Sequence, residues 1–275
     1  LAVGGLLTTD FVLDYLSEMK LWFDYNRSDG KFAVDIINIH LGPDTTDPEN
    51  SGMVKKIQEI QGWIDQNAPG TELWISEFEV PMSCEAEGVN NHENETYQLR
   101  YAQRVARTYL TAIGAGVDRV TKFQLRDEGS GVYADSGLVT EKGKWDKKLA
   151  WYYVSCMTTV LEHADFLTAS TENGICCQTF TDRINGNTIY CLWSPTSDGI
   201  TIPDYAVSVG NEAHAYMTIP GTYAEGITTE LEINDGNVSV DISETPVFLT
   251  VSGQNQTIIN GRGQYIKPQS ICLSS

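Results

Sequence analysis

Glu72-Leu73-Trp74-Ile75-Ser76-Glu77-Phe78-Glu79-Val80 is the stretch of sequence on which the fold assignment depends. It has the composition of a short buried strand, yet it carries the carboxylate Glu77 among residues that normally exclude charge. Side chains alternate between faces along a strand, which predicts that Glu77 shares a face with Ile75 and that Phe78 lies on the other. A parallel α/β barrel places such a carboxylate at its catalytic rim. The alternative is an edge strand whose Glu77 only meets water.

Strand-like and helix-like runs alternate over residues 1–165. The strand-like runs are 1–7, 34–40, 72–80 and 120–125, and the helix-like runs are 11–25, 53–64, 97–114 and 149–163. This alternation predicts a parallel sheet covered by helices. Right-handed crossovers put the carboxyl ends of parallel strands on one rim, where α/β proteins carry their catalytic groups. The rim would bring together His40, Glu77 and the segment 124–128.

The pattern changes to short antiparallel strands after Thr168. The strand-like runs are 175–180, 188–193, 206–209, 213–219, 227–233, 238–242 and 246–251. Turn signals at Asn185-Gly186-Asn187 and Asp235-Gly236 separate some of them, which predicts a β-sandwich. The predicted division is α/β for 1–165, an all-β sandwich for 166–253 and an extension for 254–275. This extension would cover a sheet edge, pair with a neighbouring chain or be disordered.

Composition and charge exclude several classes of protein. The chain of 275 residues is 41% hydrophobic and 20% charged, which is typical of a globular protein. Its net charge of −19 argues against nucleic acid and anionic membrane surfaces as partners, because both attract Lys and Arg. No apolar run approaches the roughly 20 residues of a membrane span. The partner that we expect is neutral or cationic.

Cysteines and glycosylation sequons indicate a secreted glycoprotein with disulfides. Six cysteines occur without CxxC spacing, so we expect no metal and no cofactor. The sequons lie at Asn26, Asn94, Asn237 and Asn255. An even cysteine count is consistent with an oxidising compartment, and reduced thiols in the cytosol are the alternative.

Two acidic groups in the first half have simpler interpretations than catalysis. Asp44, Asp47 and Glu49 lack the regular ligand spacing of a calcium loop, which predicts a solvated acidic loop. Asp127 and Glu128 follow the fourth strand, where loop capping or salt bridges are expected.

Several motifs together resemble the last four βα units of a clan A glycoside hydrolase, a (β/α)8 barrel. They are Gly4-Gly5-Leu6, 35–40, Trp74-Ile75-Ser76-Glu77-Phe78, 125–128, Ser136-Gly137-Leu138 and 148–153. Residues 242–249 are similar to the closing strand of the small β-sandwich often attached to such barrels. The resemblance implies a partial TIM-type barrel, strands five to eight, followed by an antiparallel β-sandwich. Its most specific element, Trp74 to Phe78, implies that Glu77 is the nucleophile of a retaining mechanism.

The resemblance also implies a carbohydrate substrate, an oligo- or polysaccharide with β-linked sugars. Retaining hydrolysis needs two carboxyl groups about 5–5.5 Å apart, one to attack and one to protonate the leaving oxygen. The side chains expected to contact sugar are Asn38, His40, Gln124, Tyr133 and Trp145. For His40 the alternative is a structural hydrogen bond, and for the two aromatic residues it is local packing.

The chain departs from the family pattern in two ways. The acid/base Glu that follows an Asn on strand four has no counterpart in residues 1–165, because Asn94-Glu95 lies after Glu77. Leu41-Gly42 stands where the family commonly has an aromatic residue that hydrogen-bonds the nucleophile. Three explanations follow: a portion of a longer glycosidase, a half-barrel completed by another copy or chain, or a non-catalytic extracellular glycoprotein with a structural, self-assembling or carbohydrate-binding role.

Overall fold

The structure, a computed structural model, describes most of the chain. The described ranges are 1–7, 11–43, 47–80, 94–128, 135–210, 214–252 and, for the backbone alone, 270–273. The predicted site residues Tyr133 and Asn255 lie outside these ranges, as does Cys84.

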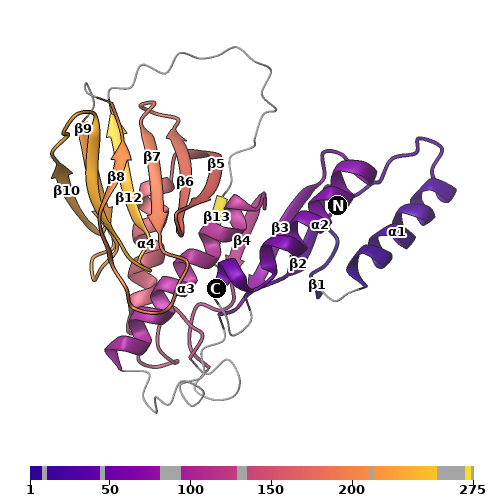
Figure 1. Ribbon diagram of the computed structural model, residues 1–275. Coiled ribbons are helices and arrows are strands. Elements are labelled where there is room, and N and C mark those ends of the chain that lie inside the picture. The colour runs from indigo at the N-terminus through magenta and orange to yellow at the C-terminus, as the bar shows by residue number, and fades with distance from the viewer. Residues whose placement is uncertain are drawn as a thin grey trace.

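A five-stranded parallel sheet forms the first part, in the order β1-β2-β3-β4-β13 (Figure 1). Its strands are β1 (Leu6–Leu7), β2 (Ile36–His40), β3 (Glu72–Phe78), β4 (Arg119–Lys122) and β13 (Ser270–Leu273). The helices are α1 (Val12–Asn26), α2 (Met53–Asn67), α3 (Glu95–Gly114) and α4 (Leu149–Leu161), with the short η1 (Pro48–Asn50). The predicted parallel pairing of the first four strands is confirmed.

The three helices that connect the first four strands, α1, α2 and α3, cover the same face of this sheet. The first four strands are neighbours in chain order, so right-handed crossovers carry every connection over one side. Ile37, Ile39 and Leu73 are 0% exposed on the covered face and belong to the main hydrophobic core. Asn38 and Trp74, on the opposite face, are half-buried. The uncovered face is therefore the more polar one.

A β-bulge near the end of β3 corrects the predicted side-chain alternation. Ile39 pairs with Ile75, but the next residue of β2, His40, pairs with Glu77, so Ser76 is an extra residue in β3. A bulge of this kind resets which face the following side chains occupy. Phe78 then points under the helices, 1% exposed, with its ring 4.8 Å from that of Tyr109. The prediction that Glu77 shares a face with Ile75 is wrong, since Glu77 lies on the uncovered face beside His40.

Antiparallel strands form the second part. The six-stranded sheet has the order β10-β9-β12-β7-β6-β5, and β8 and β11 form a separate pair. The strands are β5 (Ala164–Glu172), β6 (Ile175–Asp182), β7 (Thr188–Trp193), β8 (Ile202–Ser208), β9 (His214–Ile219), β10 (Ile227–Leu231), β11 (Asn237–Ile242) and β12 (Val247–Ser252). A second apolar cluster, including Leu192 and Val240, lies between the two sheets. Both predicted turns are observed, with Gly186, Asp235 and Gly236 at positive φ.

The sequence analysis did not predict β5 or β13. β5 is mostly exposed and polar, so it lacks the apolar alternation of a half-buried strand. It begins at Ala164, just before the predicted division at 165/166. β13 pairs in parallel with β4, which is the first of the three alternatives for the C-terminal extension.

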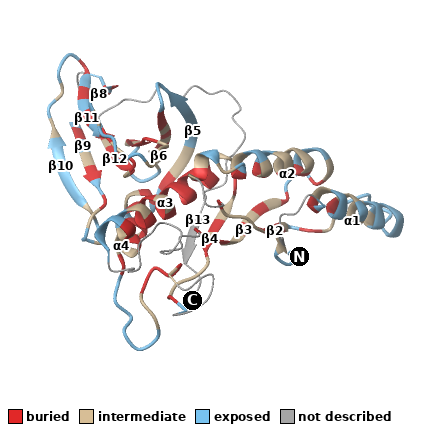
Figure 2. Ribbon diagram, turned by 60° about the horizontal axis from the view of Figure 1, so that its bottom comes forward, coloured by how far each residue is buried: buried red, intermediate tan, exposed pale blue. Residues whose placement is uncertain are grey.

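One hydrophobic core joins the two parts. Trp193 and Phe248 of the six-stranded sheet belong to the same cluster as Tyr109 of α3 and Met157 of α4. Figure 2 shows α3 buried along most of its length between the parallel sheet and the six-stranded sheet. The two sheets therefore share α3 as a common support.

A buried ion pair reinforces this junction and corrects a second prediction. Arg107 of α3, 1% exposed, donates from Nε to Glu49 Oε1 at 2.9 Å and from Nη2 to Oε2 at 2.6 Å. Trp193 Nε1 donates to the same carboxylate at 2.6 Å. Asp47 accepts a hydrogen bond from Ser197. Asp47 and Glu49 are thus engaged by protein groups, and the prediction that both lie in a solvated loop is wrong.

The cysteines with described side chains are all thiols. Cys156, Cys176, Cys177 and Cys191 form no disulfide. Within the described ranges, no helix has the length and apolar character to cross a bilayer.

Candidate functional site

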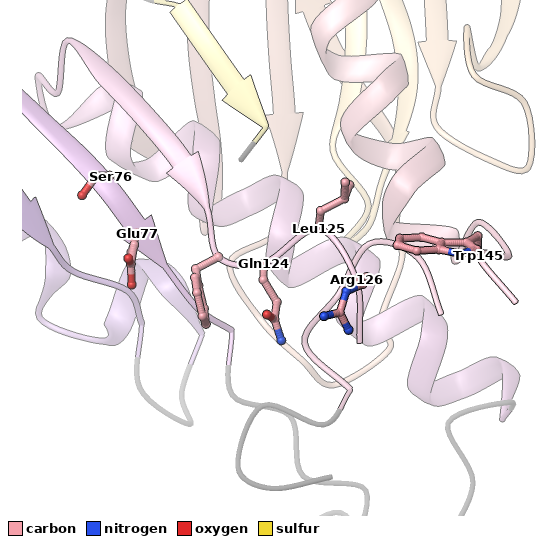
Figure 3. Close-up of a pocket in the computed structure, with 7 residues that line it drawn as sticks. Ser76, Glu77, Gln124, Leu125, Arg126 and Trp145 are labelled. Carbon is pink, nitrogen blue, oxygen red and sulfur yellow. The ribbon is translucent and has the colours of Figure 1, made fainter. Parts of the chain in front are cut away.

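The carboxyl ends of β2, β3 and β4 lie at one rim, and the end of β3 and the segment after β4 line a cavity of about 480 Å³ there. It is lined by Ser76, Glu77, Phe123, Gln124, Leu125, Arg126 and Trp145. In Figure 3 the side chains of Glu77, Gln124 and Arg126 project toward the same side, with Trp145 beyond them. Three of the predicted site residues, Glu77, Gln124 and Trp145, therefore line one cavity.

His40 lies directly beside the Glu77 carboxylate. The distance from His40 Nδ1 to Glu77 Oε2 is 3.4 Å, and the two side chains are 29% and 36% exposed. The backbone supports the pair, since Leu41 N donates to Glu77 O at 3.0 Å. Among the described residues, His40 is the side chain that reaches this carboxylate. The imidazole can orient Glu77 and, when protonated, stabilise its negative charge.

The glycine before β1 makes room for that imidazole. A Cβ on Gly5 would come within 2.0 Å of His40 Nε2. A larger residue at position 5 would therefore displace His40 from its present position. This gives a physical reason for the second glycine of the Gly4-Gly5-Leu6 motif.

Gly42 accounts for one departure from the family pattern. A Cβ at this position would lie 2.5 Å from the carbonyl oxygen of Glu79, because the two backbone segments pass close together. Backbone cannot yield as a flexible side chain can, so an aromatic residue does not fit here without moving one of the segments. No tyrosine in the described part of the chain hydrogen-bonds Glu77.

A second carboxyl group, Glu79, follows Glu77 and was not singled out in the sequence. Burial raises the pKa of Glu79 and the nearby Glu77 raises it further, while Lys122 and His40 oppose the change. Burial lowers the pKa of Lys122 to about 7, partly offset by Glu79. Lys122 Nζ donates to Ser136 O at 3.0 Å beneath the rim. The Glu-x-Glu spacing was the available signal for the second carboxyl group.

The two predicted amide residues differ in their relation to the cavity. Gln124 lines it, and its buried Nε2 has no hydrogen-bond partner among the described residues. This donor is therefore available to an oxygen of a bound ligand. Asn38 lies on the same face of the sheet as His40, two residues earlier in β2, and does not line the cavity. Its Oδ1 is also buried and unpartnered within the described ranges.

Trp145 and Arg126 complete the wall of the cavity. Trp145 is 50% exposed and has a φ of 62°, a conformation that non-glycine residues rarely adopt outside functional sites and turns. Its indole presents an apolar surface at this wall. Arg126 was quoted in the family motif without a role. Its Nη1 donates to Asp127 O at 3.2 Å, and no carboxylate in the described ranges pairs with it.

Buried contacts fix the loop that carries Gln124 and Arg126. Lys148 Nζ lies 3.0 Å from Asp127 Oδ1, and Gly137 N donates to the same oxygen at 2.7 Å. A salt-bridge role for Asp127 is thus confirmed. A Cβ on Gly137 would come within 2.3 Å of the Arg126 backbone, so the Ser136-Gly137-Leu138 motif requires glycine at its centre.

The predicted glycosylation sites lie apart from this cavity. Asn26 ends α1, Asn94 caps α3 through bonds to Thr96 N and Tyr97 N, and Asn237 begins β11. All three residues are exposed, and none lines the cavity. Glycosylation at these positions stays a prediction. Among the described side chains, no group of three or more His, Cys, Asp and Glu residues is arranged to hold a metal ion.

Comparison with known proteins identifies the fold. No protein-family model and no curated protein sequence matches the chain. A family 39 glycoside hydrolase from Bacteroides cellulosilyticus WH2 is 15% identical with a TM-score of 0.60, over 84% of this chain and 46% of that one. A glucosidase from Croceicoccus marinus is 10% identical with a TM-score of 0.59, over 92% of this chain and 60% of that one. A GH51 α-L-arabinofuranosidase from Thermotoga petrophila RKU-1 is 11% identical with a TM-score of 0.54, over 92% of this chain and 66% of that one.

The chain thus spans from under half to about two thirds of the length of these proteins. At such low sequence identity, the similarity establishes a shared fold. The expected resemblance to glycoside hydrolases is confirmed at that level: this chain has a mixed α/β fold similar to part of known glycoside hydrolase structures.

Proposed function

We propose that this chain is the C-terminal portion of a retaining glycoside hydrolase that acts on a β-linked oligo- or polysaccharide. In this proposal the parallel sheet is half of a (β/α)8 barrel, the antiparallel strands are its attached β-sandwich, and Glu77 is the nucleophile. One observation carries it. Glu77 lies on the uncovered face at the carboxyl end of a parallel strand, 3.4 Å from His40 and in the same cavity as Gln124 and Trp145.

Each residue has a role in this mechanism. Glu77 attacks the anomeric carbon and forms a covalent glycosyl intermediate, which water then hydrolyses. His40 holds the attacking carboxylate in place, and Gln124 donates from Nε2 to a sugar oxygen. Trp145 stacks on a sugar ring at the outer wall. The acid that protonates the leaving group comes from a segment outside this chain, because the family supplies it from strand four.

An uncovered face on α1 supports a partner half. Four aromatic side chains are exposed: Phe11, just before the helix, by 72%, Tyr15 by 51%, Trp22 by 60% and Tyr25 by 91%. Their spacing of four, seven and three residues places them along one stripe of the helix. α1 follows β1, the first strand in the sheet order. A preceding βα unit, from a longer chain or from another chain, would cover both the stripe and the free edge of β1.

A substrate that needs no acid tests the nucleophile directly. Dinitrophenolate leaves a glycoside without a proton, so a dinitrophenyl glycoside can react with Glu77 even when the acid is missing. We expect one equivalent of dinitrophenolate per chain and a glycosyl adduct on the Glu77 peptide for a β-glucoside or a β-xyloside. Glu77→Gln should reduce the rate of release at least about 100-fold, because an amide is a poor nucleophile.

Glu72→Gln is the matched control, since Glu72 begins the same strand at the opposite end. It should release dinitrophenolate as the unchanged protein does. Equal labelling of the Glu77→Gln variant would exclude Glu77 as the nucleophile.

The second candidate is a non-catalytic extracellular glycoprotein with a structural, self-assembling or carbohydrate-binding role. It is favoured by the close approach of Gly42 to the Glu79 backbone, which leaves no space for the aromatic partner of the nucleophile. The pairing of β13 with the edge of β4 is also a form of strand addition that a second copy could provide. Binding of a saccharide without any release from the activated glycosides would favour this function.

Secretion and glycosylation belong to the same proposal. Asn26, Asn94 and Asn237 are exposed and accessible to a glycosylating enzyme. Mass spectrometry of the protein from its natural source, before and after removal of N-linked glycans, tests them together with Asn255. An unchanged mass would contradict glycosylation at these four positions.

A further inference from the structure

A second cavity, of about 410 Å³, lies where the end of α3 meets α2, β5 and β6. It shares no lining residue with the Glu77 cavity. Its walls include Gln58 of α2, Thr111 and Gly114 of α3, Ser170 of β5 and Gln178 of β6, above Glu49. The volume falls in the range of small-molecule sites, roughly 300–1,000 Å³.

Two buried polar side chains in this wall lack partners in the described structure. Gln178 is 3% exposed; its Nε2 donates to Leu110 O at 2.6 Å, while its Oε1 accepts no hydrogen bond. Thr111 is 6% exposed, and its Oγ1 forms no hydrogen bond. Buried polar atoms are almost always satisfied in native proteins, by protein, water or ligand. The two atoms therefore leave hydrogen-bonding positions that a water molecule or a hydroxyl group of a bound molecule would fill.

The shape of the site depends on a glycine. A Cβ on Gly114 would lie 2.4 Å from Gln178 Nε2, so only glycine lets the amide lie against the end of α3. The bond from Gln178 Nε2 to Leu110 O then fixes which end of the amide is engaged. The carbonyl end is left as the acceptor.

The charges around the cavity favour a neutral ligand. Both oxygens of Glu49 are engaged, by Arg107 and, for Oε1, also by Trp193. This ion pair cancels the charges of Glu49 and Arg107, so neither an anion nor a cation finds an unpaired counterion in it. The remaining polar groups are the hydroxyls of Ser170 and Thr171, the thiol of Cys176 and the amide of Gln58, and alanines add apolar surface. A molecule with several hydroxyl groups matches this mixture, because each hydroxyl both donates and accepts.

We propose that this cavity binds a neutral saccharide of mono- or disaccharide size. One sugar hydroxyl donates to Gln178 Oε1 and another bonds to Thr111 Oγ1, while the less polar face of the ring lies on Ala115 and Ala169. The site lies at the junction of the two sheets and is independent of chemistry at Glu77. A chain with this site would hold a saccharide at a second point, away from the rim.

Binding of individual sugars tests the proposal on the full chain. Glucose, xylose, arabinose, cellobiose and xylobiose are titrated while the amide signals of residues near 111 and 178 are followed by NMR. We expect saturable shifts for at least one neutral sugar. Thr111→Val, which keeps the shape and removes the hydroxyl, and Gln178→Met should each weaken binding about tenfold or more.

Glu77→Gln should bind at this site as tightly as the unchanged protein, which separates the second cavity from the proposed active site. Glucuronate is the charged counterpart of glucose and should bind more weakly. The proposal is overturned if no neutral sugar shifts these signals, which would indicate water alone, or if both variants bind with unchanged affinity. If one of these variants loses its folded NMR spectrum, the other one carries the test, and Thr111→Ser, which keeps the hydroxyl, should retain binding.

Discussion

Gly5 carries no side chain, and the imidazole of His40 occupies the space where one would lie. At the scale of single residues, the proposed site depends on several such contacts. His40 reaches Glu77 because Gly5 has no side chain in its way. Gln124 has an unpaired donor, Nε2, which no described neighbour engages. These contacts can be altered one at a time without changing the sheet.

Gly5→Ala should separate His40 from Glu77. The added Cβ would lie 2.0 Å from His40 Nε2, so the imidazole must move. We expect capture of the dinitrophenyl glycoside, that is, transfer of its sugar to Glu77, to slow about tenfold. This is the effect expected from the loss of one hydrogen bond that positions the nucleophile, and the free energy of unfolding should change little. Gly4→Ala is the matched control, because nothing lies within 4 Å of its added Cβ. Equal rates in the two variants would contradict a positioning role for His40.

Gln124→Met should affect binding and stability differently. Methionine has a similar length and removes a buried donor that lacks a partner, so the free energy of unfolding should stay equal or rise by up to about 1 kcal/mol. Glycoside capture should weaken about tenfold, because the donor to the sugar is lost. Urea unfolding measures the change in stability. The dependence of dinitrophenolate release on glycoside concentration measures the change in binding. A drop in stability with unchanged capture would show that Gln124 serves the fold instead.

At the scale of elements, close packing of backbone against backbone constrains the loop after β4. Its segment 126–127 passes against Gly137, and Asp127 is held by Lys148. α2, by contrast, contains a glycine, Gly62, with nothing within 4 Å of an added Cβ. The same substitution should therefore have opposite effects at these two positions.

Gly137→Ala should destabilise the protein and Gly62→Ala should stabilise it. At position 137 the Cβ would meet backbone atoms at 2.3 Å, a clash that costs roughly 1–3 kcal/mol and shifts the wall of the cavity. At position 62, inside α2, alanine should add about 0.5–1 kcal/mol because it favours helix. Urea unfolding measures both, and capture should fall only in the first variant. Two changes of the same sign would contradict this account of the packing.

At the scale of the whole molecule, one core and one buried ion pair join the parallel and antiparallel sheets. Arg107 links α3 to Glu49, and Trp193 of β7 shares that carboxylate. Breaking a buried pair of this kind costs about 3–5 kcal/mol, so the two parts should unfold together. Titration of a second buried cation, Lys122, then makes the stability of this unit depend on pH.

Lys122 should make the protein more stable as the pH rises from 7. Its pKa is lowered from 10.5 to about 7 by burial, so between these values the unfolded chain binds a proton that the folded chain has released. Stability then rises with pH by up to about 1.4 kcal/mol per unit, and below pH 7 the contribution is constant. Lys122→Met lacks this titration. The difference in the free energy of unfolding between the unchanged protein and this variant should therefore change by about 3 kcal/mol from pH 7 to 9.5.

Chemical unfolding at several pH values measures the difference. Lys55→Met is the control, because the Lys55 side chain is 83% exposed. The free energy of unfolding of Lys55→Met should differ from that of the unchanged protein by the same amount at every pH. A constant difference for Lys122→Met as well would mean that Lys122 keeps its ordinary pKa in the folded chain.

The sequence by itself determined the order of the elements apart from β5 and β13, the change from parallel to antiparallel pairing and the strand ends that carry polar groups. These features follow from local periodicity and from turn residues such as Asn185-Gly186, which act within a few positions of the chain. Glu77, His40 and Gln124 could be named before their contacts were known because they lie at predicted strand ends, and Trp145 was named from the resemblance to glycoside hydrolases.

Only the tertiary structure decided which way Glu77 faces, what Asp47 and Glu49 contact, and which segment pairs with the edge of β4. The bulge at Ser76 is set by the register with β2, and the partner of Glu49 lies 58 residues away on α3. The second cavity likewise exists only where α3 meets β5 and β6. Contacts between distant segments leave no periodic trace in a single sequence, so folding alone establishes them.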